Sequence, residues 1–353
     1  MKNTKISLRH LIGISIALGI STSSFADLTI LSSPSEAGQA QISWSSEEVG
    51  QLLNDDVSSF SNEPSPQGSV SVSTSVRTSN GVTPAAPQPA KTVQIFDTAK
   101  YSNQPSVSAR AALVMDANTG EVLYSKNSNT ALPIASITKL MTAVVISDAQ
   151  LNMSEKITLQ SGDFSCSGCK SSSSTLRVGD SMNRAEALLF ALMKSENPAA
   201  SALARTYPGG RAAFIAKMNA KAKELGMHST KYMESTGLHP GNVASARDLG
   251  ILVNTASQYG LIRQFSTTPS YDFNLGYRVL KSNNTNALVR NGGYNINISK
   301  TGFINEAGRC VVMHTTLNNR PVAVVLLGAS DSATRTNDAV RLMNWTSNLP
   351  KAI

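Results

Sequence analysis

Ala135-Ser-Ile-Thr-Lys-Leu-Met-Thr-Ala143 opens the segment from which the fold can be worked out. Pro133 and Ser136 suit the start of a helix, and apolar residues then recur at helical spacing. Because few charged side chains interrupt this pattern, the helix predicted over residues 136–149 should be buried. Lys139, inside that helix, is therefore an anomaly that needs a chemical explanation.

Ser136 and Lys139 lie three positions apart, so on a helix the lysine amine can reach the serine hydroxyl. A serine is a poor nucleophile without a base, and a lysine can serve as that base when burial and a nearby cation lower its pKa. The first helical turn also directs unpaired N–H groups toward a developing oxyanion. The spacing thus predicts a nucleophile and a base, although a helix-capping serine beside a lysine that reaches water has the same spacing.

Two further segments supply what this pair lacks. Lys194-Ser-Glu-Asn197 ends an apolar helical run and precedes Pro198, so its serine and asparagine are predicted on a loop between helices. Lys300-Thr-Gly302 comes directly after a strand predicted over residues 294–299. There the lysine and threonine could bind a carboxylate while the glycine admits substrate backbone. Each segment alone is common, and their joint occurrence is informative.

In this order S-x-x-K, S-x-N and K-T-G resemble the motif set of penicillin-binding proteins and class A β-lactamases. The wider context, Lys300–Cys310 and Ser235-Thr-Gly-Leu238 followed by Ser245-Ala-Arg-Asp248, is similar to the D-alanyl-D-alanine carboxypeptidase and endopeptidase family of low-molecular-mass penicillin-binding proteins. The resemblance covers roughly residues 105–350. It implies a serine hydrolase without cofactor or metal, whose partners are peptidoglycan stem peptides and, as inhibitors, β-lactam antibiotics.

The resemblance also implies a role for each matching residue. Ser136 would form the acyl-enzyme, Lys139 would accept its proton, and Ser195 would bridge proton transfer. The oxyanion hole would consist of the N–H groups of Ser136 and Phe303, and Arg335 would lie near the terminal carboxylate of the substrate. The substrate-binding set as a whole is Asn197, Lys300, Thr301, Gly302, Phe303 and Arg335.

Strand patterns occur at both ends of this region, with helical patterns between them. Hairpins are predicted at residues 111–124 and at residues 310–327, the second around Asn318 and Asn319, which tolerate left-handed backbone. The predicted helices cover residues 136–149, 184–205, 211–225, 245–258 and 337–345. We therefore predict an α+β, penicillin-binding and β-lactamase-like domain: one antiparallel sheet of about five strands, flanked by helices and carrying an inserted helical subdomain.

The N-terminal part is expected to lie outside this domain. Residues 1–26 combine basic residues, an apolar run and a small-residue cleavage site, which predicts a secretory signal. The apolar run is about half of the roughly 20 residues that cross a bilayer, so no transmembrane segment is expected in the mature chain. Residues 27–103 are rich in Ser, Pro and Gln and are predicted to be a disordered tether before the peptidase domain at 104–353. The predicted location is the periplasm.

The charge of the predicted domain limits which classes of binding partner are plausible. Residues 101–353 hold 25 Lys and Arg against 15 Asp and Glu, which suits a polyanionic matrix. Scattered basic residues, low aromatic content and the lack of a binding motif argue against nucleic acid as a partner.

The cysteines suggest one disulfide. Cys166 and Cys169 lie close together in a Ser/Gly-rich loop, which favours a local disulfide and leaves Cys310 free. A zinc site would need further Cys or His ligands near this pair in the sequence.

Other enzyme classes fit less well. A Ser-His-Asp hydrolase would need one of His228, His239 and His314 together with a nucleophile elbow, which the sequence lacks. A class A β-lactamase would need a glutamate in an E-x-x-L-N segment, but Glu234 is followed by Ser-Thr-Gly-Leu238. A non-catalytic cell-wall-binding module would fit the basic charge, yet none of the three motifs is degraded.

The length of chain beyond K-T-G bears on which peptide bond is cleaved. By resemblance, carboxypeptidases of the family typically add a β-rich domain and an amphipathic membrane helix, whereas only about 50 residues come after Gly302 here. This favours an endopeptidase that cleaves cross-links between stem peptides. A short D-alanyl-D-alanine carboxypeptidase is the alternative.

Overall fold

The structure is a computed structural model that describes residues 101 and 103–350. The predicted signal segment, residues 1–26, and nearly all of the predicted tether, residues 27–103, lie outside the described residues. The division of the chain at residues 26 and 103 therefore stays a prediction.

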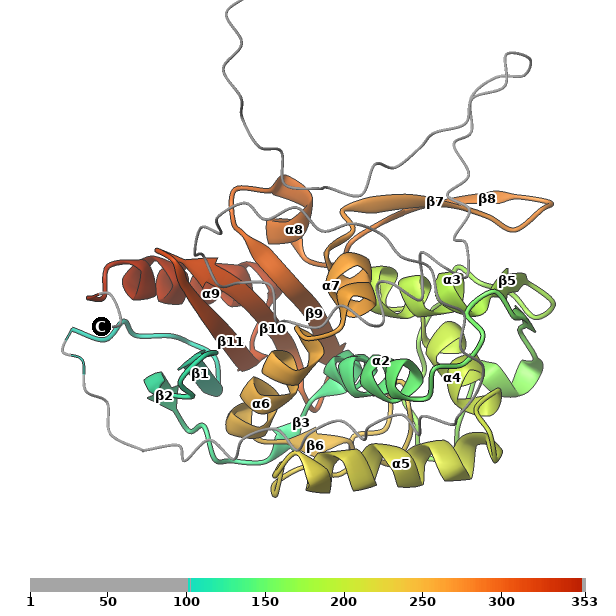
Figure 1. Ribbon diagram of the computed structural model, residues 1–353, viewed down its shortest axis with the longest axis horizontal. Coiled ribbons are helices and arrows are strands. Elements are labelled where there is room, and N and C mark those ends of the chain that lie inside the picture. Colours follow the sequence, from blue (N-terminus) through green and yellow to red (C-terminus); the bar gives the residue numbers. More distant parts are fainter. Residues whose placement is uncertain (1–100, 102, 351–353) are drawn as a thin grey trace, which may run out of the picture. The chain divides into compact units, whose positions relative to one another are not determined.

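A five-stranded antiparallel sheet, in the order β2-β1-β11-β10-β9, is at the centre of the fold (Figure 1). Its strands are β1 (Ala111–Asp116), β2 (Val122–Lys126), β9 (Ile296–Ile304), β10 (Gly308–Leu317) and β11 (Arg320–Ala329). β1 pairs with β11, with Leu113 opposite Val325, so the two ends of the domain share one sheet. The predicted α+β fold with a sheet of about five strands is confirmed.

Edge strand β9 extends further than the sequence pattern predicts. We predicted a strand that ends at residue 299 with K-T-G after it, but Lys300–Gly302 lies inside β9 and pairs with residues 310–312 of β10. Main-chain pairing along β10 outweighs the weak strand propensity of glycine at Gly302. The K-T-G motif is therefore part of the sheet rather than of a loop.

Helices fill the chain between β2 and β9, as predicted for the inserted subdomain (Figure 1). The helices are α2 (Thr138–Asp148), α3 (Arg184–Leu189), α4 (Asn197–Arg205), α5 (Gly210–Glu224), α6 (Ala246–Ala256), α7 (Gly260–Thr267), α8 (Ala287–Asn291) and, after the sheet, α9 (Ser332–Ser347). α9 begins five residues before the predicted 337, because Asp331 caps it by accepting the N–H of Thr334.

The predicted helix over residues 184–205 is interrupted. α3 ends at Leu189, a π-helical turn covers Phe190–Lys194, and Ser195 adopts a left-handed φ of 69°. A new helix, α4, begins at Asn197 with Pro198 in its first turn, where the missing N–H of proline costs nothing. The predicted continuity is wrong, while the predicted loop position of Ser195 is confirmed and that of Asn197 becomes a helix start.

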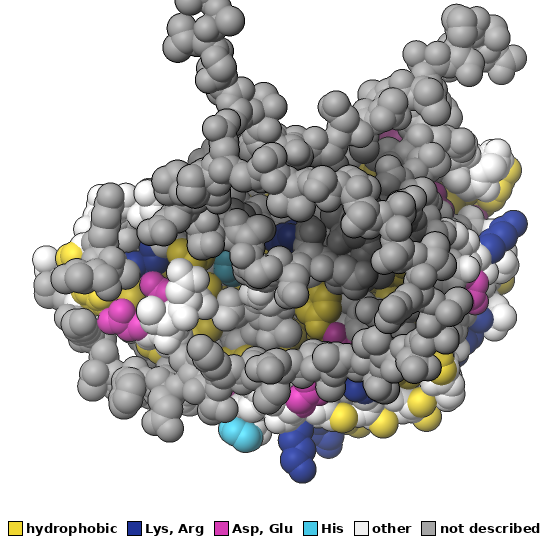
Figure 2. Space-filling model, viewed as in Figure 1, with side chains coloured by type: hydrophobic (Ala, Val, Ile, Leu, Met, Phe, Trp, Pro, Cys, Tyr) yellow, Lys and Arg dark blue, Asp and Glu magenta, His cyan; other side chains and the backbone are white. Residues whose placement is uncertain are grey.

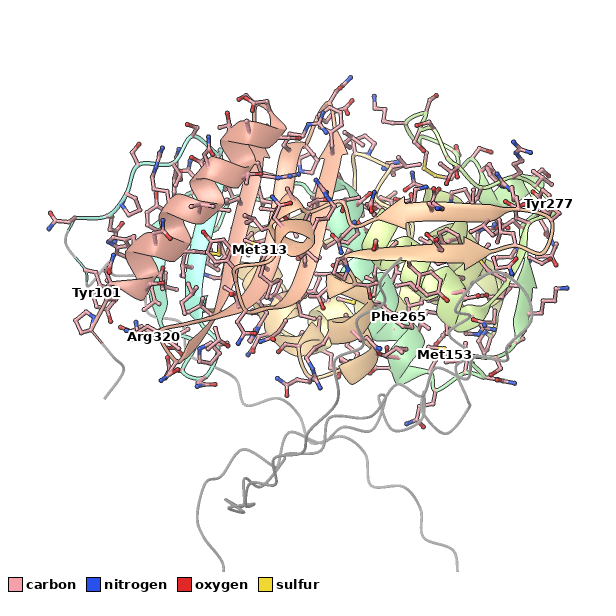
Figure 3. All side chains as sticks on the ribbon, turned by 90° about the horizontal axis from the view of Figure 1, so that it is seen from above. Tyr101, Met153, Phe265, Tyr277, Met313 and Arg320 are labelled. Atoms are coloured by element: carbon pink, nitrogen blue, oxygen red, sulfur yellow. A yellow bond between two sulfur atoms is a disulfide. The ribbon has the colours of Figure 1, made fainter. Side chains whose placement is uncertain are left out.

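The sheet has an apolar core on each face. α9 packs across β10 and β11 (Figure 3), and Met313, Val324 and Leu342 belong to the core between them. The helical insertion covers the opposite face through α6 and α7, and Leu113 of β1 and Leu140 of α2 both belong to the larger core on this side. The site motifs lie on the side of the helical insertion, so α9 supports the sheet from behind.

Several small elements had no clear sequence pattern. The hairpin of β7 (Ser270–Asn274) and β8 (Val279–Asn283) extends over α3 (Figure 1), and Phe273 of β7 stacks on Phe190. Shorter pairs join β3 (Leu132–Pro133) to β6 (Val243–Ala244) and β4 (Lys156–Thr158) to β5 (Ser181–Asn183). These pairs brace the helical insertion.

The surface agrees with the charge analysis. On the part of the face that Figure 2 displays in colour, Lys and Arg side chains are scattered rather than gathered in one patch. Among the described residues, none of the helices combines the length and the apolar character that a membrane crossing requires.

Candidate active site

Ser136 lies in a short 3-10 turn, Ala135–Ile137, that leads directly into α2. Ala135 before it has a positive φ of 49°, which is uncommon for a residue with a Cβ. Two glycines face this turn from other elements. A Cβ on Gly302 would lie 2.9 Å from the Ile134 carbonyl oxygen, and one on Gly237 would lie 1.9 Å from the Ala135 carbonyl oxygen. Glycine at both positions lets β9 and the 235–237 turn close around the serine.

Lys139, on the first turn of α2, is fully buried. Its Nζ lies 3.0 Å from Ser136 Oγ, 2.6 Å from Asn197 Oδ1 and 2.6 Å from the Thr236 carbonyl oxygen. Burial lowers the pKa of Lys139 to about 7, even though the negative charges of Glu234 and Glu196 raise it. A substantial fraction of Lys139 is thus neutral near pH 7.

The second lysine of the site, Lys300, is also buried and projects from β9 toward the S-x-N segment. Its Nζ donates to Ser195 Oγ at 2.9 Å and to the Thr301 carbonyl at 3.0 Å. Burial, reinforced by the positive charges of Lys139 and Arg335, holds the pKa of Lys300 well below its usual range. An anionic ligand at this point would favour the charged form of Lys300.

Three further predicted residues lie on β9 and on the first turn of α9. Thr301 contacts the hydroxyl of Thr285 at 2.7 Å. Phe303 continues β9 beyond Gly302, keeps 43% of its surface exposed, and stacks beneath the guanidinium of Arg309 at 3.7 Å. Arg335, on the first turn of α9, is only 7% exposed, and its charge acts on Lys300.

The structure therefore brings the three motifs together from three different elements. S-x-x-K comes from the start of α2, S-x-N from the break before α4, and K-T-G from β9. Direct contacts join Lys139 to Asn197 and Lys300 to Ser195. Ser136, Lys139 and Asn197 form one hydrogen-bonded group, Lys300 and Ser195 form a second, and the S-x-N segment links the two along the chain.

Some contributing residues were not assigned from the sequence. Thr236 supplies a carbonyl to Lys139, and its Ser-Thr-Gly context was the available signal. Ser172 accepts a hydrogen bond from Asn197 Nδ2 at 2.8 Å, and nothing in its serine-rich loop singles it out. Glu196, inside S-x-N, accepts hydrogen bonds from Ser174 and Thr175 of that same loop. The serine-rich loop thus contacts both Glu196, the x position of S-x-N, and Asn197, its last residue.

The cysteines of this loop are paired as predicted. Cys166 and Cys169 form a disulfide, and Cys310 is free and buried. Burial raises the pKa of the Cys310 thiol to about 11, so little of the reactive thiolate forms near neutral pH. The ligand atoms of Cys166, Cys169 and Glu234 lie within 4.8 Å of one another, but sulfurs joined in a disulfide offer no thiolate to a metal ion.

A serine paired with a buried lysine, opposite a K-T-G edge strand, defines the class of serine enzymes to which penicillin-binding proteins and class A β-lactamases belong. A family model described as D-alanyl-D-alanine carboxypeptidase, of a serine peptidase family, matches residues 98–331. The chain belongs to this family.

Known proteins place it more closely. The chain is 47% identical over 249 residues to the D-alanyl-D-alanine endopeptidase of Pseudomonas aeruginosa, covering 69% of this chain and 78% of that protein. It is 45% identical over 266 residues to the D-alanyl-D-alanine endopeptidase of Escherichia coli, covering 74% and 84% respectively. The crystal structure of the Streptomyces K15 DD-transpeptidase is similar with a TM-score of 0.64 and 29% identity, covering 70% of this chain and 99% of that one.

Proposed function

We propose that this protein is a serine-type D-alanyl-D-alanine endopeptidase that cleaves peptidoglycan cross-links through an acyl-enzyme on Ser136. Nearly half of its matched residues are identical to those of two proteins named for that activity. The observation that carries the mechanism is the set of contacts around Lys139 Nζ.

Lys139 can act as the base because its neighbours fix its orientation. Neutral Lys139 has two N–H bonds and one lone pair. The Asn197 Oδ1 and Thr236 carbonyl oxygens, both at 2.6 Å, can only accept, so they take the two N–H bonds. The lone pair then faces Ser136 Oγ, 3.0 Å away, which is the one contact able to donate a proton.

Acylation uses this arrangement directly. Lys139 accepts the Ser136 proton while Oγ attacks the carbonyl carbon of the D-alanyl residue. The N–H groups of Ser136 and Phe303 stabilise the tetrahedral oxyanion, where loss of one donor costs about 10²- to 10³-fold in rate. The C–N bond then breaks, and the leaving amine takes the proton that Lys139 accepted from Ser136, relayed by Ser195, whose Oγ contacts Lys300 Nζ.

The substrate is held by its own carboxylate, which lies next to the bond that is cleaved. Lys300, Thr301 and Arg335 bind this carboxylate, or its counterpart in a β-lactam, and Gly302 lets the peptide backbone approach β9. Water hydrolyses the acyl-enzyme, which releases the peptide acid and restores the Ser136 hydroxyl. A β-lactam undergoes the same first step and acts as an inhibitor.

We also infer export to the periplasm, where stem peptides are available. The N-terminal signal pattern supports this location. D-alanyl-D-alanine carboxypeptidase activity is the second candidate, because the matching family model carries that description.

Digestion of purified muropeptides tests the proposal. We expect cross-linked dimers to be split into monomers, with no activity in a Ser136→Ala variant. Release of D-alanine from pentapeptide monomers without dimer splitting would instead establish the carboxypeptidase. No change in either substrate would refute both activities.

A further inference from the structure

The carboxylate of Glu234 organises the turn that faces the nucleophile. It accepts the backbone N–H of Thr236 at 2.5 Å and of Gly237 at 2.6 Å, and the Asn242 side chain adds a third donor at 3.0 Å. Only 9% of Glu234 is exposed, and it forms no ion pair with any other described residue. A buried negative charge is therefore held by neutral donors alone.

This turn is fixed against α2 on both sides of Lys139. Asn242 Nδ2 donates to Thr138 Oγ1 at 3.0 Å, and Thr142 Oγ1 donates to the Ser235 carbonyl at 2.7 Å. Between these two contacts, the Thr236 carbonyl accepts from Lys139 Nζ. The N–H that Glu234 holds and the carbonyl that Lys139 contacts belong to the same residue, Thr236.

Four charged groups act on this corner of the site. The carboxylates of Glu234 and Glu196 favour the ammonium form of Lys139, whereas the charges of Lys139 and Arg335 disfavour the ammonium form of Lys300. Glu196 is engaged with Ser174, Thr175 and, at 3.6 Å, Lys194. Glu234 has no such cation and is the leading favourable charge for Lys139.

We propose that Glu234 is a positioning residue for acyl transfer: it holds the Thr236 carbonyl on Lys139, and its charge keeps Lys139 basic enough to accept the serine proton. A buried amine without a nearby negative charge loses proton affinity and becomes a weak general base. This inference rests on the proposed function, because it concerns the base of the same site.

The test compares acylation rates of the full mature chain with benzylpenicillin between pH 5 and 9. Glu234→Gln removes a charge that raises the pKa of Lys139 and should move the acid-side midpoint to lower pH by about one unit. Glu234→Asp keeps the charge but shortens the side chain, so its midpoint should stay while its plateau rate falls about tenfold. Glu224→Gln, an exposed carboxylate on α5, is the matched control and should match the parent protein.

The outcomes distinguish the electrostatic role of Glu234 from its positioning role. An unchanged midpoint in folded Glu234→Gln would overturn the electrostatic role, and an undiminished plateau in Glu234→Asp would overturn the positioning role. If Glu234→Gln does not fold, as circular dichroism would reveal, the Glu234→Asp result still decides the positioning role. If the parent protein itself is not acylated, the proposed function fails rather than this inference.

Discussion

Two buried lysines share the site, and their contacts give them different tasks. Lys139 has two obligate acceptors and one hydroxyl around its amine, which leaves a lone pair for the serine proton. Lys300 contacts a hydroxyl and a carbonyl and has Arg335 behind it, which favours the binding of an anion. We therefore propose that two amines of the same chemical type act as base and as carboxylate receptor.

The proposed role of Lys139 as the base predicts how acylation depends on pH. Its pKa of about 7 means that the neutral, active form is half populated near that pH and becomes about tenfold rarer with each further unit of acidification. The acylation rate should therefore fall as pH drops below 7 and level off above it. Stopped-flow acylation by benzylpenicillin measures this, and a rate that stays flat from mild acid to about pH 9 would contradict the assignment.

The nucleophile can be tested by mass. Intact-protein mass spectrometry should show one benzylpenicillin added to the parent protein and none to Ser136→Ala. Ser147→Ala is a matched control, because Ser147 is a buried hydroxyl on the same helix without a hydrogen-bond partner in the described structure. Equal labelling of Ser136→Ala and the control would show that the acyl group is carried elsewhere.

The 235–237 turn lies so close to the Ser136 turn that Gly237 leaves no room for a side chain. Gly237 has a φ of 89°, and a Cβ there would meet the Ala135 carbonyl oxygen at 1.9 Å. Gly237→Ala should reduce acylation at least about 100-fold, because the Ser136 turn must move by an ångström or more. Gly276→Ala is the control: its φ is 85° but its surroundings are open, so it isolates backbone strain of about 1 kcal/mol.

Rates of benzylpenicillin acylation and thermal melting of both variants decide this point. Loss of acylation in Gly237→Ala with a melting temperature close to that of Gly276→Ala supports the steric explanation. Equal activity in the two variants would mean that the turn can relax without disturbing the serine.

The serine-rich loop offers a second prediction at this scale. The Cys166–Cys169 disulfide closes a very short ring, so reduction should change the melting temperature little, but the loop carries Ser172, which contacts Asn197. We expect acylation of the parent protein to slow about threefold in dithiothreitol. A Cys166→Ser, Cys169→Ser double variant should have this slower rate both with and without dithiothreitol. Identical rates with and without dithiothreitol would show that the disulfide does not support the site.

Across the whole domain, residue patterns predicted the sheet and most helices but not their interruptions. The hairpin at residues 111–124 and the one around Asn318 carry local turn chemistry that is readable from the sequence. The break at Ser195 depends on tertiary contacts: Lys300 lies 105 positions away in the chain, and only folding places it beside the left-handed serine. The same holds for Thr236, whose contribution is a backbone carbonyl that no side-chain motif encodes.

The two cores allow a prediction about which packing contacts affect only the free energy of unfolding and which also affect the acylation rate. Leu342 of α9 and Leu140 of α2 are both fully buried, on opposite faces of the sheet. Replacing either by alanine should lower the free energy of unfolding by about 2–5 kcal/mol, the usual range for a leucine cavity. Only Leu140 belongs to the helix that carries Lys139, so Leu140→Ala should also slow acylation, whereas Leu342→Ala should leave the rate at room temperature unchanged.

Urea unfolding monitored by circular dichroism measures the first effect, and benzylpenicillin acylation in the absence of urea measures the second. An equal loss of acylation in both variants would mean that the sheet transmits packing changes from its α9 face to the site. Acylation lost only in Leu140→Ala would place the packing support of Lys139 in the helical insertion, and would show that the Leu342 contact of α9 affects stability without affecting the site.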